Sequence, residues 1–211
     1  MIFDLLFIGI VLASVVTLAT AAVSALRGRR QRAASLLVRY LKFAGIYLVA
    51  LVVVSLVSPQ RVLAVGEDRC FDDWCLAVED VAVTPELGQG EHVLRANGAF
   101  YSVTLRLSNH ARGRDQRASS AAIHLIDDRG RWHDFSPAGQ RAYEAQHGPV
   151  VPLTATIPVG QSLTTVQIFD LPLDAHDVGL AVEHPVGFSP ARLSIGDEAS
   201  LLHKPTIVRL K

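Results

Sequence analysis

The sequence predicts two N-terminal transmembrane helices followed by an all-β sandwich of the immunoglobulin-like class. Residues 1–57 are almost entirely apolar, with their charge confined to Asp4 and one basic stretch. After residue 57, short stretches of alternating apolar and polar residues are separated by Gly, Pro, Asn and Asp, as in sandwiches. A small closed barrel is the competing architecture. The hydrophobic content of 50% and the formal net charge of zero are averages over these two different parts, so they describe neither part well.

The first apolar segment is long enough to cross a membrane. Residues 3–26 are apolar or small apart from Asp4, and a bilayer core of about 30 Å needs roughly 20 such residues in a helix. A cleaved signal peptide is the alternative, since Val23, Ser24 and Ala25 would suit a signal peptidase. A signal peptide carries its positive charge before the apolar region, whereas here the basic residues follow it. We therefore expect a retained helix.

The second apolar segment covers residues 36–57. Its uninterrupted part, residues 43–57, is short for a membrane span. It reaches membrane length when Arg39 and Lys42 lie at the interface and extend their cations towards water. Pro59 is expected to end the helix.

A basic cluster between the two helices predicts their orientation. Residues 27–35 form the expected linker, which contains Arg27, Arg29, Arg30 and Arg32. Short loops rich in Lys and Arg stay in the cytoplasm, so the linker is expected inside, with the N-terminus and everything after residue 57 outside. A nucleic-acid patch is the alternative for a basic cluster, but its position between two spans argues against that reading.

Small residues recur along the first helix. They fall every fourth residue, at Gly9, Ala13, Thr17, Ala21 and Ala25. Such a ridge lets helix backbones approach closely in lipid. The expected partner is the second helix of the same hairpin, and the alternative is a second copy of the chain.

The remaining chain is expected to contain a linker, residues 58–75, and a sandwich domain, residues 76–211. One short helix is expected at residues 137–146. Period-two patterning and turn residues predict eight strands, the first of which should end before Pro85. They are residues 76–83, 100–107, 121–126, 131–135, 150–157, 163–169, 178–183 and 206–210.

Three segments carry a resemblance to a known family. Residues 100–109 contain a tyrosine, alternating apolar residues and then Asn109; residues 126–130 end an apolar strand with Asp-Asp-Arg-Gly; residues 157–162 precede Phe169-Asp170-Leu171-Pro172. Over residues 76–183 the chain resembles a bacterial envelope family of unknown function with a telokin-like, immunoglobulin-like fold. The resemblance implies an extracytoplasmic sandwich and assigns no activity or functional residue. The double-helix anchor departs from the lipoprotein or single-span start of that family.

The two cysteines, Cys70 and Cys75, are expected to form a structural disulfide. If the topology is right, both lie in an oxidising compartment, where nearby cysteines usually pair. A redox pair is one alternative, but active redox motifs separate their cysteines by two residues and here the separation is four. A metal site is the other alternative, and it would need further ligands.

Candidate catalytic and metal residues are few. The strand residues His124 and His133 could face each other across the turn at residues 127–130, with Asp134 nearby, as weak metal-ligand candidates. A metal site needs three or four converging ligands, and ordinary polar strand residues are the alternative. The sequence contains no His-Glu-x-x-His, Gly-x-Ser-x-Gly or Gly-x-x-x-x-Gly-Lys motif. The paired aspartates at residues 72–73 and 127–128 suit local turn bonds better than acid–base chemistry.

A candidate binding surface contains Trp132, Arg141 and Tyr143. Exposed aromatic residues and arginines contribute most to interfaces, although Trp132 could instead pack in the sandwich core. After residue 57 the sequence has 19 acidic residues (20 less Asp4) and 14 basic ones (20 less six). This excess of five acidic residues predicts no nucleic-acid partner.

These observations predict a multi-pass protein of the cell membrane whose C-terminal domain is periplasmic or extracellular. We expect a non-catalytic binding or accessory module of the cell envelope, without a cofactor. The expected partners are the lipid bilayer and either an envelope protein or a second copy. The alternatives are a structural subunit of a membrane complex, assembling through the helical hairpin, and a metal-dependent enzyme that uses the strand histidines.

Overall fold

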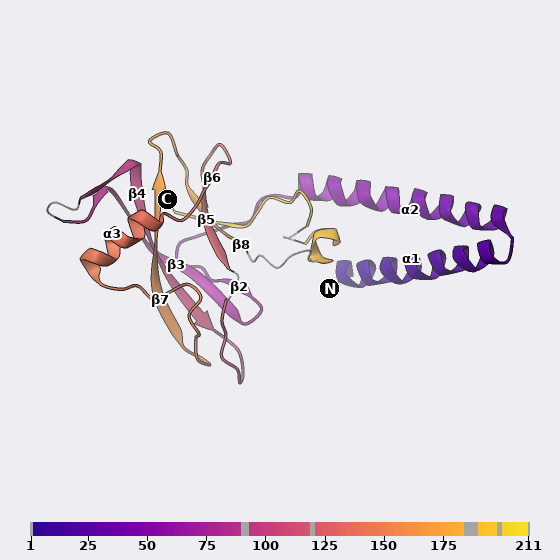
Figure 1. The fold of residues 1–211 in the computed structure, drawn as a ribbon, viewed down its shortest axis with the longest axis horizontal. Coiled ribbons are helices and arrows are strands. Elements are labelled where there is room, and N and C mark those ends of the chain that lie inside the picture. Colours follow the sequence, from indigo (N-terminus) through magenta and orange to yellow (C-terminus); the bar gives the residue numbers. More distant parts are fainter. Residues whose placement is uncertain (1, 90–92, 119–120, 184–189, 198–199, 211) are drawn as a thin grey trace. The chain divides into compact units, whose positions relative to one another are not determined.

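The computed structural model divides into two compact units (Figure 1). The structure describes all residues except 1, 90–92, 119–120, 184–189, 198–199 and 211. The helical unit comprises residues 1–60 and 187–205, and the β unit comprises residues 61–186 and 206–211.

A tight turn joins the two long helices of the helical unit. Helix α1 is Ile2–Leu26 and helix α2 is Arg30–Val57. Gly28 adopts the left-handed conformation, with φ of 73°. Its N–H donates to the Ala25 carbonyl, and the next N–H, of Arg29, donates to the Ser24 carbonyl. This is the Schellman motif, in which glycine follows the end of a helix.

Helix α2 begins at Arg30 instead of the expected residue 36. Arg, Gln, Ala and Leu all have good helix propensity, and the stretch contains no breaker after Gly28. The basic segment between the helices is therefore mostly the first turns of α2, and only residues 27–29 lie outside both helices.

Helix α1 packs against α2 along a face that only partly matches the expected small-residue ridge. Thr17 is half-buried and Ala21 is buried, whereas Gly9, Ala13 and Ala25 are exposed. The physical reason is helical geometry: successive residues four apart rotate by about 40° around the helix axis. A ridge of five such residues therefore winds away from the partner helix.

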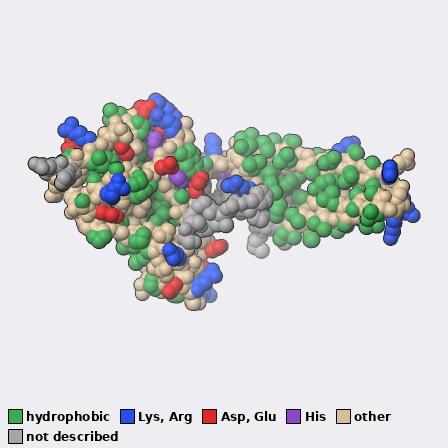
Figure 2. Space-filling model, in the orientation of Figure 1, with side chains coloured by type: hydrophobic (Ala, Val, Ile, Leu, Met, Phe, Trp, Pro, Cys, Tyr) green, Lys and Arg blue, Asp and Glu red, His purple; other side chains and the backbone are tan. Residues whose placement is uncertain are grey.

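The outer surface of the hairpin is apolar. Figure 2 shows hydrophobic side chains along both helices and basic side chains at the end where the helices join. Both helices are long and apolar enough to cross a membrane, and only 11% of the most apolar window of each is buried. The hydroxyls of Ser14 and Thr20 donate to carbonyls one turn earlier, of Ile10 and Val16, so they need no water partner.

A segment from far along the chain belongs to the helical unit. The strap, residues 190–197 and 200–205, starts with a 3-10 turn, η2 (Pro190–Leu193). The Tyr47 hydroxyl donates to the Leu193 carbonyl. The Ser55 and Ser200 hydroxyls lie 2.6 Å apart. The strap thus contacts α2 at positions about two turns apart, and it lies within residues 76–211, the range predicted for the sandwich.

Within its described residues, the β unit contains two stacked sheets and one helix, α3 (Pro137–His147). The five-stranded sheet has the order β1-β9-β8-β5-β6, and the four-stranded sheet has the order β2-β3-β4-β7. The strands are β1 (Val62–Leu63), β2 (Arg69–Phe71), β3 (Trp74–Leu87), β4 (Leu94–Asn109), β5 (Ala122–Ile126), β6 (Trp132–His133), β7 (Ser162–Leu171), β8 (Gly179–Glu183) and β9 (Ile207–Arg209).

The main core lies between the two sheets. Alternate residues of strands from both sheets are fully buried there, as period-two patterning predicts. From the four-stranded sheet these include Leu76, Val103, Leu105 and Phe169, and from the five-stranded sheet Leu125, Leu180 and Val208. This arrangement confirms the expected β-sandwich architecture.

Some expected strands differ from the observed ones. Strand β3 continues past Pro85, because the pairing of β3 with β4 shifts register between Thr84 and Glu86 and leaves Pro85 at a bulge. Residues 150–157 form no strand; only Ile157 makes an isolated bridge, to Gln116. The sequence does not predict the short strands β1 and β2, because strands of two or three residues leave no periodic pattern.

Helix α3 covers the outer side of the four-stranded sheet. The Ser136 side chain caps its first turn by accepting from the Gly139 N–H at 3.2 Å, and Pro137 follows the cap. The Gln140 side chain accepts from the Ile168 N–H and donates to the Val166 carbonyl, both at 3.2 Å. These bonds fasten the helix to β7. The helix covers a second small core that contains Phe100 and Ile168.

Candidate functional site

The turn between β5 and β6 is organised around the buried carboxylate of Asp127. Its side chain is fully buried and accepts from the backbone N–H groups of Arg129 (3.0 Å) and Arg131 (2.9 Å). It also accepts from the Arg131 Nε (2.6 Å) and the His133 Nε2 (3.1 Å). Burial alone would raise the pKa of Asp127, but these donors hold it well below its ordinary value.

A second carboxylate extends this cluster to the loop before β8. Both terminal nitrogens of Arg131 contact Asp174, at 3.1 and 3.0 Å, and Arg129 also pairs with Asp174. The hydrogen bond from Arg131 lowers the pKa of Asp174. The four side chains form an alternating chain of charges, so neither carboxylate is free for acid–base chemistry. Sequence reasoning missed Asp174, which lies 43 residues from Arg131 and belongs to no motif.

His124 and His133, the expected weak metal candidates, lie on opposite faces of the five-stranded sheet. His133 pairs with Leu125 and reaches Asp127 on the inner side. His124 lies on the outer side, where its Nδ1–H donates to Asp134 at 2.8 Å and its Nε2 lies 3.9 Å from a Glu183 oxygen. The two histidines therefore do not converge. Among the described residues, no group of three or more His, Cys, Asp or Glu side chains is placed to hold a metal ion.

The expected binding-surface residues occupy two layers. Trp132 lies on β6 of the five-stranded sheet and is 44% exposed, and its ring meets His124 edge-on with centroids 5.3 Å apart. Arg141 and Tyr143 lie on α3, which packs against the four-stranded sheet. Tyr143 is half-buried. Trp132 is thus grouped with His124, Asp134 and Glu183 instead.

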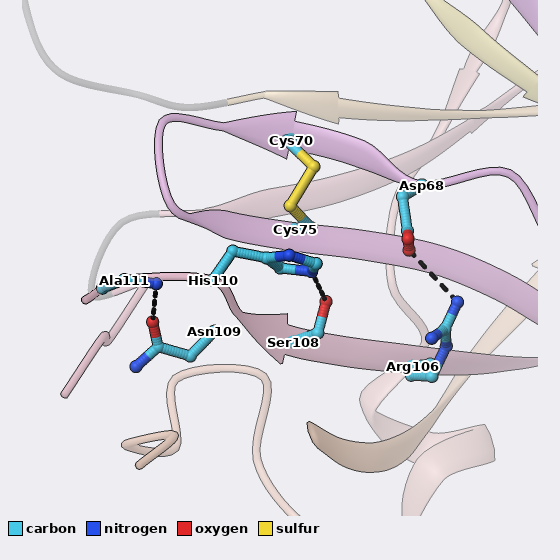
Figure 3. The surroundings of a disulfide bond; sticks show 8 residues. All are labelled: Asp68, Cys70, Cys75, Arg106, Ser108, Asn109, His110 and Ala111. Atoms are coloured by element: carbon cyan, nitrogen blue, oxygen red, sulfur yellow. Dashed lines mark hydrogen bonds and ion pairs between the residues drawn. A yellow bond between two sulfur atoms is a disulfide. The ribbon is translucent and has the colours of Figure 1, made fainter. Parts of the chain in front are cut away.

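The disulfide closes the β2–β3 hairpin (Figure 3). Cys70 and Cys75 lie directly opposite each other, with Cα atoms 3.9 Å apart. On the same hairpin Phe71 packs against Trp74, with ring centroids 5.9 Å apart. The structure confirms the expected pairing of the two cysteines, which fastens a strand of three residues to the edge of the sheet.

Polar side chains of β4 complete the surroundings of the disulfide (Figure 3). Arg106 donates to Asp68 at 3.2 Å, and His110 shares a hydrogen bond with Ser108 at 3.1 Å. The buried Asn109 amide accepts from the Ala111 N–H at 2.8 Å and donates to the Ile157 carbonyl at 2.9 Å. These bonds fix the end of the hairpin.

Comparison with known proteins gives fold similarity alone. No protein-family model matches the chain, and no curated protein matches it. A conserved hypothetical protein from Bacillus anthracis is similar in structure, with 15% identity and a TM-score of 0.43 over 57% of this chain and 88% of that one.

Two further solved structures are similar at the same level. An uncharacterised β-sandwich protein from Clostridium difficile has 10% identity and a TM-score of 0.42 over 73% of this chain and 96% of its own. A secreted protein from Mycobacterium tuberculosis has 16% identity and a TM-score of 0.42 over 60% of this chain and 91% of its own. At these identities the similarities assign no activity or ligand to this chain.

Proposed function

We propose that this protein is a membrane-anchored module of the cell envelope, whose helical hairpin spans the membrane and whose β unit is a non-catalytic binding or accessory domain outside it. The observation that carries the proposal is the exposure of the two long apolar helices. Only 11% of the most apolar window of each is buried. Large side chains such as Val16, Ile46 and Val53 are more than half exposed. The hydrophobic effect makes such a surface unstable in water and stable in lipid.

The proposed orientation rests on the turn between the helices. Its exposed arginines, Arg27, Arg29, Arg30 and Arg32, would lie on the cytoplasmic side, because basic short loops are retained there. The N-terminus and the β unit would then lie outside. The Cys70–Cys75 disulfide supports the placement of the β unit outside, because disulfides persist in oxidising compartments.

The proposed binding face is the outer side of the β5–β6 hairpin. Trp132 is exposed there beside His124, with the carboxylates of Asp134 and Glu183 on either side of the imidazole. An exposed aromatic residue with two exposed carboxylates suits an envelope protein with a basic surface. We propose an immunoglobulin-like sandwich for the β unit, supported by its two mainly antiparallel sheets.

A membrane extraction experiment tests the anchor. Membranes that contain the full chain are washed with alkaline carbonate, and the intact mass of the retained protein is measured. We expect the full 211-residue chain in the pellet. Release into the supernatant would contradict a spanning hairpin, and a mass that lacks the first helix would show that a signal peptide had been removed.

A second experiment tests the binding face. The full chain and its Trp132→Ala variant are purified from detergent-solubilised membranes, and proteins that copurify are quantified by mass spectrometry. We expect a partner that is lost with Trp132→Ala and kept with Leu173→Ala. Leu173 is a suitable control because it is 80% exposed and lies in the loop after β7. Equal recovery with both variants would contradict the assignment of Trp132.

A structural role in a larger membrane complex is the second candidate function. It is favoured by the outward position of Gly9 and Ala13, which leaves a small-residue surface on α1 away from α2. Ala13→Leu should then dissociate the complex and leave the hairpin intact. Ala21→Leu should disturb the hairpin itself, because Ala21 is buried.

A further inference from the structure

Two shallow hollows meet at the turn between α1 and α2. The first has a volume of about 310 Å³, and its polar lining consists mainly of Ser24, Arg27, Arg29 and Arg32. The second is lined by residues 28–32 and shares Arg29 and Arg32 with the first. We call this combined depression the arginine hollow. It lies wholly within the helical unit.

The charge of the arginine hollow is not balanced by neighbouring acidic residues. The sequence contains no Asp or Glu between Asp4 and Glu67. Within the described part of the chain, the arginines of the hollow form no ion pair. Clustered guanidinium groups repel one another, so an anion that lies among them is favoured.

The backbone adds donors to the same place. Helix α2 starts there without a side-chain cap and with no acidic residue in its first turn. The first N–H groups of a helix lack intrahelical partners and carry partial positive charge, which favours phosphate and other anions.

A hydroxyl on a mostly buried residue provides an independent observation. Ser24 lines the first hollow and is only 8% exposed. Its hydroxyl makes no hydrogen bond within the described residues, whereas the hydroxyls of Ser14 and Thr20 on the same helix both donate to the backbone. A hydroxyl that lines the hollow and has no protein partner can donate to an anion that lies there.

The walls of the hollow distinguish between kinds of anion. Besides its polar residues, the first hollow is lined by Ala19 and Val23, which continue into the exposed apolar side of α1. A phosphate that carries acyl chains can place its charge among the arginines and its chains along this apolar side. Inorganic phosphate would leave the apolar wall unused.

We propose that the arginine hollow binds the headgroup phosphate of an anionic phospholipid in the leaflet that faces the turn. This inference rests on the proposed membrane hairpin. Arg29 and Arg32 would form paired hydrogen bonds to phosphate oxygens, and Ser24 would donate one more. The site would hold one lipid at the closed end of the hairpin and fasten that end to its leaflet.

Native mass spectrometry of the full chain in detergent tests the proposal. The protein is titrated with phosphatidylglycerol, phosphatidylcholine and inorganic phosphate. We expect one tightly retained phosphatidylglycerol and weaker binding of phosphatidylcholine. Inorganic phosphate at tenfold excess should fail to displace the lipid. Complete displacement by inorganic phosphate, or equal retention of the two lipids, would overturn the assignment.

Two double variants separate a built site from general attraction to basic charge. Arg29→Gln with Arg32→Gln removes two charges inside the hollow. Arg39→Gln with Lys42→Gln removes two charges on α2 outside it. We expect the first pair to weaken phosphatidylglycerol binding at least tenfold and the second less than twofold. Equal losses would overturn the site.

A variant without a charge change gives an independent readout. Ser24→Ala removes the hydroxyl and adds no bulk, and it should weaken lipid binding severalfold while the helical circular dichroism stays unchanged. Carbonate extraction of the same variants distinguishes the two proposals. If the wild-type chain is extracted by carbonate, the proposed hairpin fails and this inference fails with it. If the chain stays in the membrane and all variants bind lipid alike, only the lipid site is overturned.

Discussion

Ser55 and Ser200 are separated by 145 residues in sequence, yet their hydroxyl oxygens lie 2.6 Å apart and both residues are buried. Ser55 lies in the last turn of α2, and Ser200 lies in the strap. A hydrogen bond between two side chains that are shielded from water helps to hold the strap against α2. The strap is therefore a part of the helical unit that only the folded structure reveals.

Paired cysteines at these positions should join spontaneously. In the Ser55→Cys, Ser200→Cys variant we expect a second disulfide, because the two hydroxyl oxygens are already close enough for a sulfur–sulfur bond after a small adjustment. Proteolysis and mass spectrometry without reductant would detect the linked peptides. The pair Leu56→Cys, Ser200→Cys is the control, because Leu56 is 60% exposed. Equal cross-linking of both pairs would contradict the contact.

The charge cluster at the β5–β6 turn should make stability depend on pH. The donors around Asp127 keep its pKa in the folded protein below 3.8, its ordinary value. As the pH falls, the unfolded chain takes up this proton before the folded protein does. The stabilisation is therefore complete above about pH 5 and is lost as the pH falls below about 4. Asp174 should act in the same direction.

The Asp127→Asn variant measures this contribution. At pH 7 it should lower the free energy of unfolding by about 1–3 kcal/mol, since buried donors lose their charged acceptor. Denaturant unfolding at several pH values should show the gap to the wild type closing below pH 4. Asp128→Asn, at an exposed position of the same turn, should change stability by less than about 0.5 kcal/mol. A gap that stayed constant with pH would argue against the charged cluster.

Gly98 permits a close backbone approach between β4 and the end of β7. A Cβ atom at this position would lie 2.3 Å from the Leu173 nitrogen and 2.6 Å from the Leu171 carbonyl oxygen. Backbone atoms cannot move aside as flexible side chains do, so Gly98→Ala should destabilise the β unit by about 1–3 kcal/mol. Thermal unfolding followed by circular dichroism checks this prediction. An unchanged midpoint temperature would show that the backbones at Gly98 and Leu173 are farther apart than described.

The disulfide should stabilise the β unit modestly. Cys70 and Cys75 close a short loop, so the chain-entropy model gives about 2 kcal/mol. The Cys70→Ser, Cys75→Ser variant should have a free energy of unfolding lower by this amount, measured by denaturant unfolding. Adding a reductant should not change the stability of the variant. The wild type should fall to the level of the variant when dithiothreitol is added. A wild type that reductant does not affect would contradict this account.

Most of the β unit could be predicted from its sequence, because strands buried on one face leave a period-two signal. Strand β4 alternates over most of its length, and Ser136-Pro137 and Gly148 mark the two ends of α3. The expected strand at residues 150–157 failed because Pro152 lies within it, Pro149 and Pro158 flank it, and its apolar content suits an extended loop equally well. Ile157 is buried there without a strand around it.

The polar contacts could not be predicted, because they join residues that are distant in sequence. Asp174 reaches Arg131 from another loop, and Ser200 reaches Ser55 although 145 residues separate them in the sequence. The histidine pair failed for a simpler reason. His133 pairs across the hairpin with Leu125, the neighbour of His124. Because successive residues of a strand point to opposite faces, His124 and His133 lie on opposite faces of the sheet.

Cysteine accessibility in spheroplasts tests the membrane topology most directly. Leu173→Cys places an exposed thiol on the β unit, and Ala34→Cys places one near the turn of the hairpin. The native cysteines are paired and should not react. We expect a membrane-impermeant maleimide to label Leu173→Cys in intact spheroplasts and Ala34→Cys only after permeabilisation. The reverse pattern, with the β unit protected until the membrane is opened, would contradict the account.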